Sequence, residues 1–166
     1  MIRLATATDL DPIMKISNDG ISIMKTQNNT QWDENYPTRE DFFDDIISNT
    51  LFVEEENGAI AGFICINTIE PKEYDTLCWK GNTTSFVIHR MAVAPAFRRK
   101  GIGHKLITFA EMLAKKEGIL FLKTDTYSNN PNMNALFVKT GFQKVGEMSF
   151  LGKPYPFFCY EKQLFS

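Results

Sequence analysis

The sequence predicts an α/β (α+β) domain built on a mixed β-sheet, and three observations lead to this fold class. The chain has 166 residues, a length that suits a single domain over 1–166. Its 43% apolar and 23% charged residues are typical of globular proteins. Short apolar runs and runs of helical spacing follow one another in the order β α α β β β α β α β β. The central β–α–β–α portion implies a parallel crossover, and the early hairpin makes the sheet mixed.

The N-terminal half predicts a strand, two helices and a hairpin. Residues 2–6 form the strand, and Thr8 caps the first helix, with carboxylates in its first turn. The second helix runs from 38 to 48. Two strands within 51–69 then pair through a turn at Asn57-Gly58, because these residues tolerate the positive φ of a hairpin turn.

The C-terminal half predicts the crossover and the end of the sheet. After an irregular stretch, the expected elements are strand 85–93, helix 101–118, strand 119–123, helix 131–140 and strands 142–150 and 155–164. We therefore expect a mostly antiparallel sheet of six to seven strands with about four helices.

Several classes of protein are disfavoured by composition. No run of 18 apolar residues could span a membrane, and the N-terminus lacks the pattern of a signal peptide. Cys65, Cys78 and Cys159 are too few and too scattered for a disulfide framework or a zinc cluster. A net charge of −2 argues against a nucleic-acid binder. We expect a reduced, cytoplasmic protein without a metal.

A basic, glycine-containing segment lies at the start of one predicted helix. Arg98, Arg99 and Lys100 come directly before Gly101, and Gly103 follows in the first turn. Helix N-termini expose unpaired N–H groups with partial positive charge, and glycine lets an anion approach the backbone. The segment therefore predicts a phosphate-binding site.

Two common phosphate motifs are excluded. A dinucleotide fingerprint needs a third glycine where this chain has Leu106, and the P-loop pattern is absent. Arg98-x-x-Gly101-x-Gly103 instead resembles the acetyl-CoA pyrophosphate loop of the GNAT superfamily of N-acetyltransferases. The segment 130–142 resembles the asparagine, short helix and closing Gly-Phe of that superfamily, and the order of elements matches over nearly the whole chain.

The resemblance implies acetyl-CoA as cosubstrate and direct transfer of acetyl to a primary amine of a small molecule or peptide. It also implies that the strands around the loop splay apart and hold the thioester between them. The residues that it places against acetyl-CoA are Met91, Ala92, Val93, Arg98, Arg99, Lys100, Gly101, Ile102, Gly103, His104, Asn130 and Phe137.

The residue that protonates the leaving thiolate is one open question. Many members of the superfamily have a tyrosine where this chain has Phe137, which cannot donate a proton. Tyr127 or a water could serve, or the thiolate could leave unaided, since a free thiol has a pKa near ~8.5. A non-catalytic, CoA-binding regulatory module is therefore the alternative function.

The general base is a second open question, because an alkyl amine with a pKa near ~10 arrives protonated. His89 lies two residues from Met91 and is expected to share its face. Glu70 follows the preceding strand and is a second candidate for the base, and Asp75 is a weaker third candidate. Asp125 is expected to be structural.

The acceptor side is the least specified part of the sequence. By resemblance, the irregular stretches that contain Trp32, Tyr36, Tyr74 and Trp79 surround the acceptor. Arg90 is expected to pair with an acid. Residues 1–75 carry a net −10 and the remainder +8, which suggests a cationic amine on the acidic side. A homodimer that pairs the aromatic C-terminal strand across chains is left open beside burial of that strand within the chain.

Overall fold

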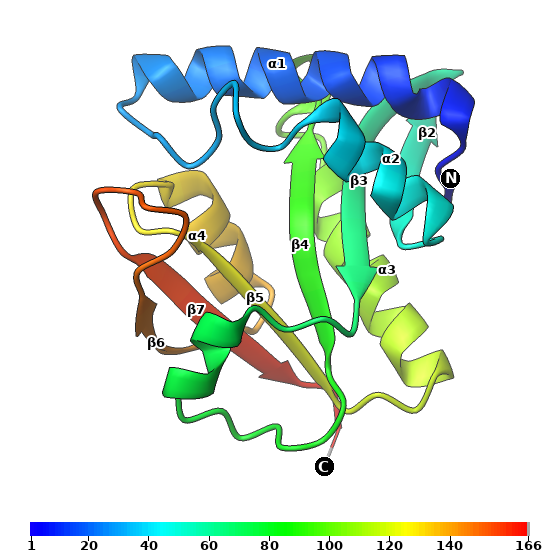
Figure 1. Cartoon of the computed structure of the whole chain (residues 1–166). Coiled ribbons are helices and arrows are strands. Elements are labelled where there is room, and N and C mark those ends of the chain that lie inside the picture. The colour runs from blue at the N-terminus through cyan, green and yellow to red at the C-terminus, as the bar shows by residue number, and fades with distance from the viewer. Residues whose placement is uncertain (166) are drawn as a thin grey trace.

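The computed structural model describes residues 1–165 and has a seven-stranded sheet at its centre (Figure 1). The strands lie in the order β1-β2-β3-β4-β5-β7-β6, and every neighbouring pair is antiparallel except β4 with β5. Their bounds are β1 Ile2–Leu4, β2 Leu51–Glu56, β3 Ala59–Asn67, β4 Phe86–Val93, β5 Phe121–Tyr127, β6 Gln143–Met148 and β7 Phe157–Gln163. The predicted fold class, a mixed and mostly antiparallel sheet, is confirmed.

Helices cover both faces of the sheet (Figure 1). They are α1 Leu10–Thr26, α2 Arg39–Ile47, α3 Ile102–Lys116 and α4 Pro131–Lys139. Two 3-10 turns, η1 Ala7–Asp9 and η3 Pro95–Phe97, each lie between a strand and a helix, and a third, η2 Lys72–Thr76, lies between β3 and β4. α1 and α2 pack on one face, whereas α3 and α4 share a core on the other. None of the helices in the described part of the chain combines the length and apolarity needed to span a bilayer.

The starts of the first two helices follow from local hydrogen bonds. Thr38, the predicted first residue of the second helix, is the cap of α2, and its side chain accepts from the backbone N–H of Asp41 at 3.2 Å. The predicted cap at Thr8 is wrong, because Thr8 lies inside η1. The cap of η1 is Thr6, two residues before Thr8, and its backbone N–H donates to the Asp9 carboxylate at 2.8 Å.

Two strand predictions can be compared directly with the sheet. Asn57 and Gly58 have φ values of 52° and 78°, the left-handed geometry expected for the β2–β3 turn. The predicted end of the fifth strand at residue 123 is wrong, since β5 continues to Tyr127. Its polar residues Thr124 to Thr126 pair with β7. This pairing keeps residues 124–126 in the strand, although their polar side chains suggested that the strand had ended. β7 lies between β5 and β6, and its hydrogen bonds are made within the chain.

The parallel pair β4–β5 is short, and this opens the middle of the sheet. The register joins only Phe86 to Leu122, Val87 to Lys123 and Ile88 to Thr124. Beyond these pairs, both strands continue without contacting each other through ladder hydrogen bonds, and α1 crosses above the opening (Figure 1). The splayed strands expected from the family resemblance are therefore present.

A β-bulge in β4 sits at the same place. Ile64 pairs with Met91 and Ile66 pairs with Ile88, so two residues of β4 oppose one of β3. Ile88 and Met91 both point into the core under α3, although they are three residues apart. His89 and Arg90 consequently both face the other side of the sheet. The expectation that His89 shares a face with Met91 is wrong, because the bulge breaks the alternation of the strand.

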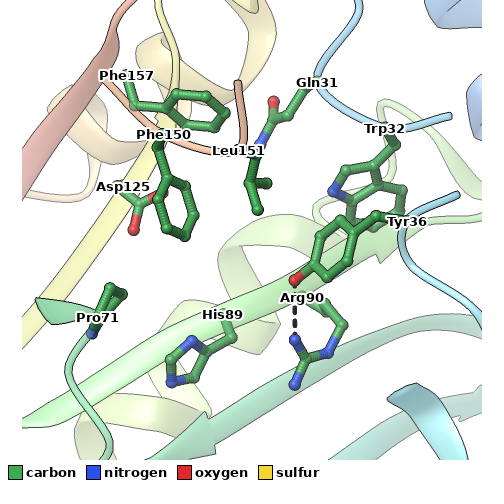
Figure 2. A pocket seen from close by; sticks show the side chains of 10 residues that line it. All are labelled: Gln31, Trp32, Tyr36, Pro71, His89, Arg90, Asp125, Phe150, Leu151 and Phe157. Atoms are coloured by element: carbon green, nitrogen blue, oxygen red, sulfur yellow. Dashed lines mark hydrogen bonds between the residues drawn. The ribbon is translucent and has the colours of Figure 1, made fainter. Parts of the chain in front are cut away.

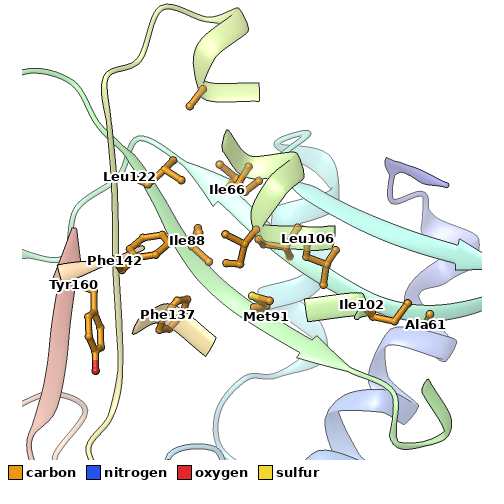
Figure 3. Close-up of a cluster of buried hydrophobic side chains, with 14 residues drawn as sticks. Ala61, Ile66, Ile88, Met91, Ile102, Leu106, Leu122, Phe137, Phe142 and Tyr160 are labelled. Atoms are coloured by element: carbon orange, nitrogen blue, oxygen red, sulfur yellow. The ribbon is translucent and has the colours of Figure 1, made fainter. Parts of the chain in front are cut away.

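The core is divided into clusters by the sheet. The largest packs under α3 and α4 and includes Ile88, Met91, Leu106 and Phe137 (Figure 3). On the opposite face, one cluster lies under α1 and α2, and another lies over β5 and β7. The gap between these last two clusters is where the cavity described below is found.

Candidate active site

The loop between β4 and α3 has an unusual backbone. Arg99 has φ 63° and Gly101 has φ 78°, both in the left-handed region. Such a conformation costs a residue with a Cβ roughly 1–2 kcal/mol and is common where the backbone shapes a binding site. Arg98, Arg99 and Lys100 are exposed, and within residues 1–165 none of these three forms an ion pair. Their charges are therefore available to an anion.

The first turn of α3 fits the same ligand. Its N–H groups at residues 102–104 have no partner within the helix. His104 is exposed there, whereas Ile102 is buried and anchors the helix to the core. A Cβ at Gly103 would lie 3.0 Å from Cδ2 of Leu136, so glycine also lets α4 approach this turn. Cations, free N–H groups and glycine together fit a pyrophosphate.

A cavity of about 60 Å³ lies on the α1 and α2 side of the opening between β4 and β5. Figure 2 shows Asp125 on the β5 side, across from His89 and Arg90 on β4. The lining residues are Gln31, Trp32, Tyr36, Pro71, His89, Arg90, Asp125, Phe150, Leu151 and Phe157. The volume has room for a few water molecules. The bulge and the divergence of the strands together form this cavity.

His89 is held as a neutral imidazole. Its Nε2 lies 2.6 Å from Oδ1 of Asn67, and that oxygen already accepts from the backbone N–H of Ile69 at 2.9 Å. An atom that accepts from an N–H is the amide oxygen, so Nε2 of His89 must donate. Burial, together with the neighbouring Arg90, lowers the pKa of His89 to about 4. Its free nitrogen is a weak base.

Arg90 is fixed by a buried ion pair, as expected. Its Nε and Nη2 donate to the Asp45 carboxylate, both at 2.7 Å, and its Nη1 donates to the Tyr36 hydroxyl at 2.8 Å. Burial lowers the pKa of Arg90, but the hydrogen bonds to Asp45 and the nearby charges together raise it by more, so the pKa lies above its usual value. The pair ties α2 and the loop after α1 to β4.

Asp125, which was expected to be structural, lies in the cavity wall. Its Oδ2 accepts from the Tyr74 hydroxyl at 2.6 Å. Burial raises the pKa of Asp125, the Tyr74 hydrogen bond lowers it and the charge of Glu73 raises it, with a net pKa of about 6. Tyr74 itself is 1% exposed. The cavity therefore holds a carboxylate that exchanges its proton close to neutral pH.

The other predicted catalytic residues have partners of their own. Glu70 forms an ion pair with Lys123, which is almost completely buried. Tyr127 lies in the core cluster over β7, outside the cavity lining. Its hydroxyl is 2.9 Å from Oγ1 of Thr30 and accepts from the backbone N–H of Tyr155 at 3.2 Å. Neither group faces the cavity formed at the bulge.

Two of the four predicted acceptor aromatics line the cavity. Trp32 and Tyr36 are in its wall. Tyr74 is not in the lining, but its hydroxyl donates a hydrogen bond to Asp125, which is. Trp79 packs against Tyr74 instead, with ring centroids 4.7 Å apart. The lining residues that sequence reasoning missed are Gln31, Pro71, Phe150, Leu151 and Phe157. They come from loops far apart in the chain, and no local pattern marks them.

Asn130 and Phe137 have structural contacts at the end of the opening. Asn130 caps α4 by accepting from the N–H of Met133 at 3.3 Å, and its amide donates to Gln31 at 2.8 Å. The ring of Phe137 is 1% exposed and packs 5.6 Å from that of Tyr160. Phe137 thus fills the core beside the opening without a polar group.

The central sheet is thus split between β4 and β5, with a basic, glycine-containing loop at one end of the opening and a cavity beside it. The sequence matches the acetyltransferase (GNAT) family over residues 21–142, and the chain belongs to this family. Proteins of the family use acetyl-CoA as the acetyl donor. No curated protein matches the sequence.

Solved structures agree with this assignment. A candidate acetyltransferase from Staphylococcus aureus Mu50 is 33% identical over 99% of both chains, with a TM-score of 0.80. An N-acetyltransferase from the same strain is 27% identical over 99% of this chain and 98% of its own, with a TM-score of 0.75. YncA from Salmonella typhimurium is a candidate acetyltransferase that was solved with its cofactor acetyl-CoA. It is 19% identical over 100% of this chain and 94% of its own, and its TM-score of 0.74 shows that it shares the fold.

Proposed function

We propose that this protein is an N-acetyltransferase that moves acetyl from acetyl-CoA directly to a primary amine of a small molecule or peptide. The observation that carries the proposal is the opening between β4 and β5, with the phosphate loop at one end and the cavity beside it. One opening can hold a donor and an acceptor in contact. Holding two reactants together supplies much of the rate gain in a transfer reaction.

The residues around the loop are suited to hold the donor. Arg98, Arg99 and Lys100, with the N–H groups at the start of α3, would hold the pyrophosphate. The backbone of Met91 to Val93 on the open edge of β4 is available to the pantetheine arm, since its β5 side is unpaired. When bound, acetyl-CoA supplies an activated acyl group. An N–H in this edge can stabilise charge on the carbonyl oxygen.

The acceptor is expected to be a cationic amine. The cavity has aromatic walls from Trp32, Tyr36 and Phe157 and a carboxylate from Asp125, which is a favourable setting for an ammonium group. The one cation in the lining, Arg90, is neutralised by Asp45. This supports the preference inferred from the acidic N-terminal half.

The experiment is thiol release from acetyl-CoA across a panel of cationic, neutral and anionic amines, with CoA binding measured in parallel by calorimetry. We expect amine-dependent release that is fastest with cationic amines. Tight binding without turnover on any amine would favour the regulatory module instead. That alternative rests on Phe137, which gives the departing thiolate no proton donor.

A further inference from the structure

Among the ten side chains that line the cavity, Asp125 is the single carboxylate. We propose that Asp125 is the catalytic residue that takes the proton from the ammonium group of the acceptor, with Tyr74 as the residue that positions it. The inference rests on the proposed acetyl transfer and adds to it the identity of the base. The argument starts from where Asp125 lies in the sheet.

Asp125 stands at the fork between the diverging strands. The last pair that joins β4 to β5 is Ile88 with Thr124. His89 and Asp125 are the next residues on the two strands, and both side chains line the cavity (Figure 2). An amine in the cavity therefore lies beside Asp125 and next to the opening in which the thioester is expected.

Tyr74 holds one oxygen of the carboxylate and leaves the other open. The Tyr74 hydroxyl donates to Oδ2 at 2.6 Å, and no other hydrogen bond from residues 1–165 reaches the Asp125 carboxylate. Among the described residues, Oγ of Ser17 is the one fully buried side-chain polar atom without a partner, so Oδ1 of Asp125 keeps access to the cavity. Tyr74 is itself fixed, because the Trp79 indole donates to its backbone carbonyl at 2.9 Å.

The surroundings of Asp125 favour proton transfer at neutral pH. The titratable and charged groups that face it are Tyr74 and Glu73 on η2, His89 and Arg90 on β4, Tyr36 before α2 and Cys159 on β7. None supplies an unpaired positive charge, since Arg90 is paired with Asp45 and His89 is neutral. Burial therefore prevails and raises the pKa of Asp125 to about 6.

This shift matters for the rate. A base with a pKa near 6 accepts a proton from an ammonium group roughly 100-fold more readily than a carboxylate with an ordinary pKa near ~4. The other two candidates are less suited. Burial lowers the pKa of His89 to about 4, and Glu70 is committed to Lys123 outside the cavity lining.

The step balances as follows. One proton of the ammonium group moves to Oδ1 of Asp125, which frees the electron pair of the amine nitrogen. That pair forms the bond to the thioester carbonyl carbon, and the carbon–sulfur bond breaks. The second proton lost from nitrogen ends on the CoA thiolate, and Asp125 returns its own proton to water through the cavity.

The test compares Asp125→Asn, Tyr74→Phe and the control Asp44→Asn, an exposed carboxylate on α2. We expect Asp125→Asn to keep acetyl-CoA affinity and folding, measured by calorimetry and thermal unfolding, while kcat/KM for the amine falls about 100-fold or more. Asp44→Asn should match the wild type. In the wild type, kcat/KM should fall at acid pH with a midpoint near 6.

A readout without substrate separates catalysis from structure. Carbon NMR titration of the free protein should show one carboxyl with a midpoint near 6 that is absent from Asp125→Asn. In Tyr74→Phe both this midpoint and the acid limb of kcat/KM should move upward together, because the lost hydrogen bond stabilises the carboxylate.

Three results would overturn the inference. Turnover by Asp125→Asn within about threefold of the wild type, with normal amine turnover in the wild type, would refute Asp125 as the base and leave the proposed function standing. A carboxyl midpoint near ~4 in the free protein would do the same. Acetyl-CoA binding with no amine turnover in the wild type would refute the proposed function, and the assignment of Asp125 would fall with it.

Discussion

Replacing Gly101 by alanine is expected to weaken acetyl-CoA binding roughly 5- to 30-fold. Gly101 has φ 78° at the start of α3, and a Cβ there would meet no atom within 4 Å. The substitution therefore adds no clash and only the cost of a left-handed alanine, about 1–2 kcal/mol. The free loop can relax away from that conformation, whereas the bound loop must keep it to present its N–H groups. The strain then appears as lost affinity.

Gly58 offers a matched control in the β2–β3 turn. It has the same φ of 78° and the same open space, but it lies far from the phosphate loop in the sequence and on another turn. Gly58→Ala should lower the thermal stability of the free protein and leave affinity unchanged. Calorimetric titration with acetyl-CoA measures both variants. Equal affinities for Gly101→Ala and the wild type would refute the idea that the left-handed helix start shapes the site.

Three further predictions concern stability and rate. Asp45→Asn should lower the free energy of unfolding, measured by urea denaturation, by about 3–5 kcal/mol, because it leaves the buried guanidinium of Arg90 unpaired. The control Asp44→Asn should change it by less than about 0.5 kcal/mol. A loss below about 1 kcal/mol in Asp45→Asn would contradict the argument. Because the pKa of His89 is lowered to about 4, its contribution to the free energy of unfolding should rise by about 3 kcal/mol as pH increases from about 4 to 6.5. Because the pKa of Asp125 is raised to about 6, its contribution should fall by about 3 kcal/mol over nearly the same pH range. Relative to the wild type, stability should then rise with pH in Asp125→Asn and fall in His89→Gln, and parallel curves in urea titrations would disprove this. Phe137→Tyr should raise kcat by giving the thiolate a proton donor, and an unchanged kcat would mean that thiolate departure does not limit the rate.

Local chemistry made the order of elements and the position of the basic, glycine-containing loop predictable from the sequence. The glycines and cations of 98–103 occupy the turn into α3, and the Asn57-Gly58 turn closes the predicted hairpin. Each of these features depends on residues within one turn of chain. Such features can be inferred without knowing which segments meet in the fold.

The bulge and the cavity could not be predicted in the same way. Alternation along β4 placed His89 with Met91, but the pairing with β3 inserts an extra residue and turns His89 to the opposite face. The sequence of β4 contains no glycine or proline to mark that bulge. Asp125 looked structural because its neighbours are threonines, and its place in the cavity wall depends on Tyr74 and the loops that meet it across the fold.

The split between β4 and β5 has a consequence for hydrogen exchange. Amides in the middle of a seven-stranded sheet ordinarily exchange slowly, because ladder hydrogen bonds protect them. Here the amides of β4 after Ile88 that point toward β5 lack such partners and face the opening. They should exchange with solvent as quickly as amides on the outer edge of a sheet. In the free protein, slowly and rapidly exchanging amides would therefore lie on opposite sides of the same strand, and binding of acetyl-CoA should protect the rapid group.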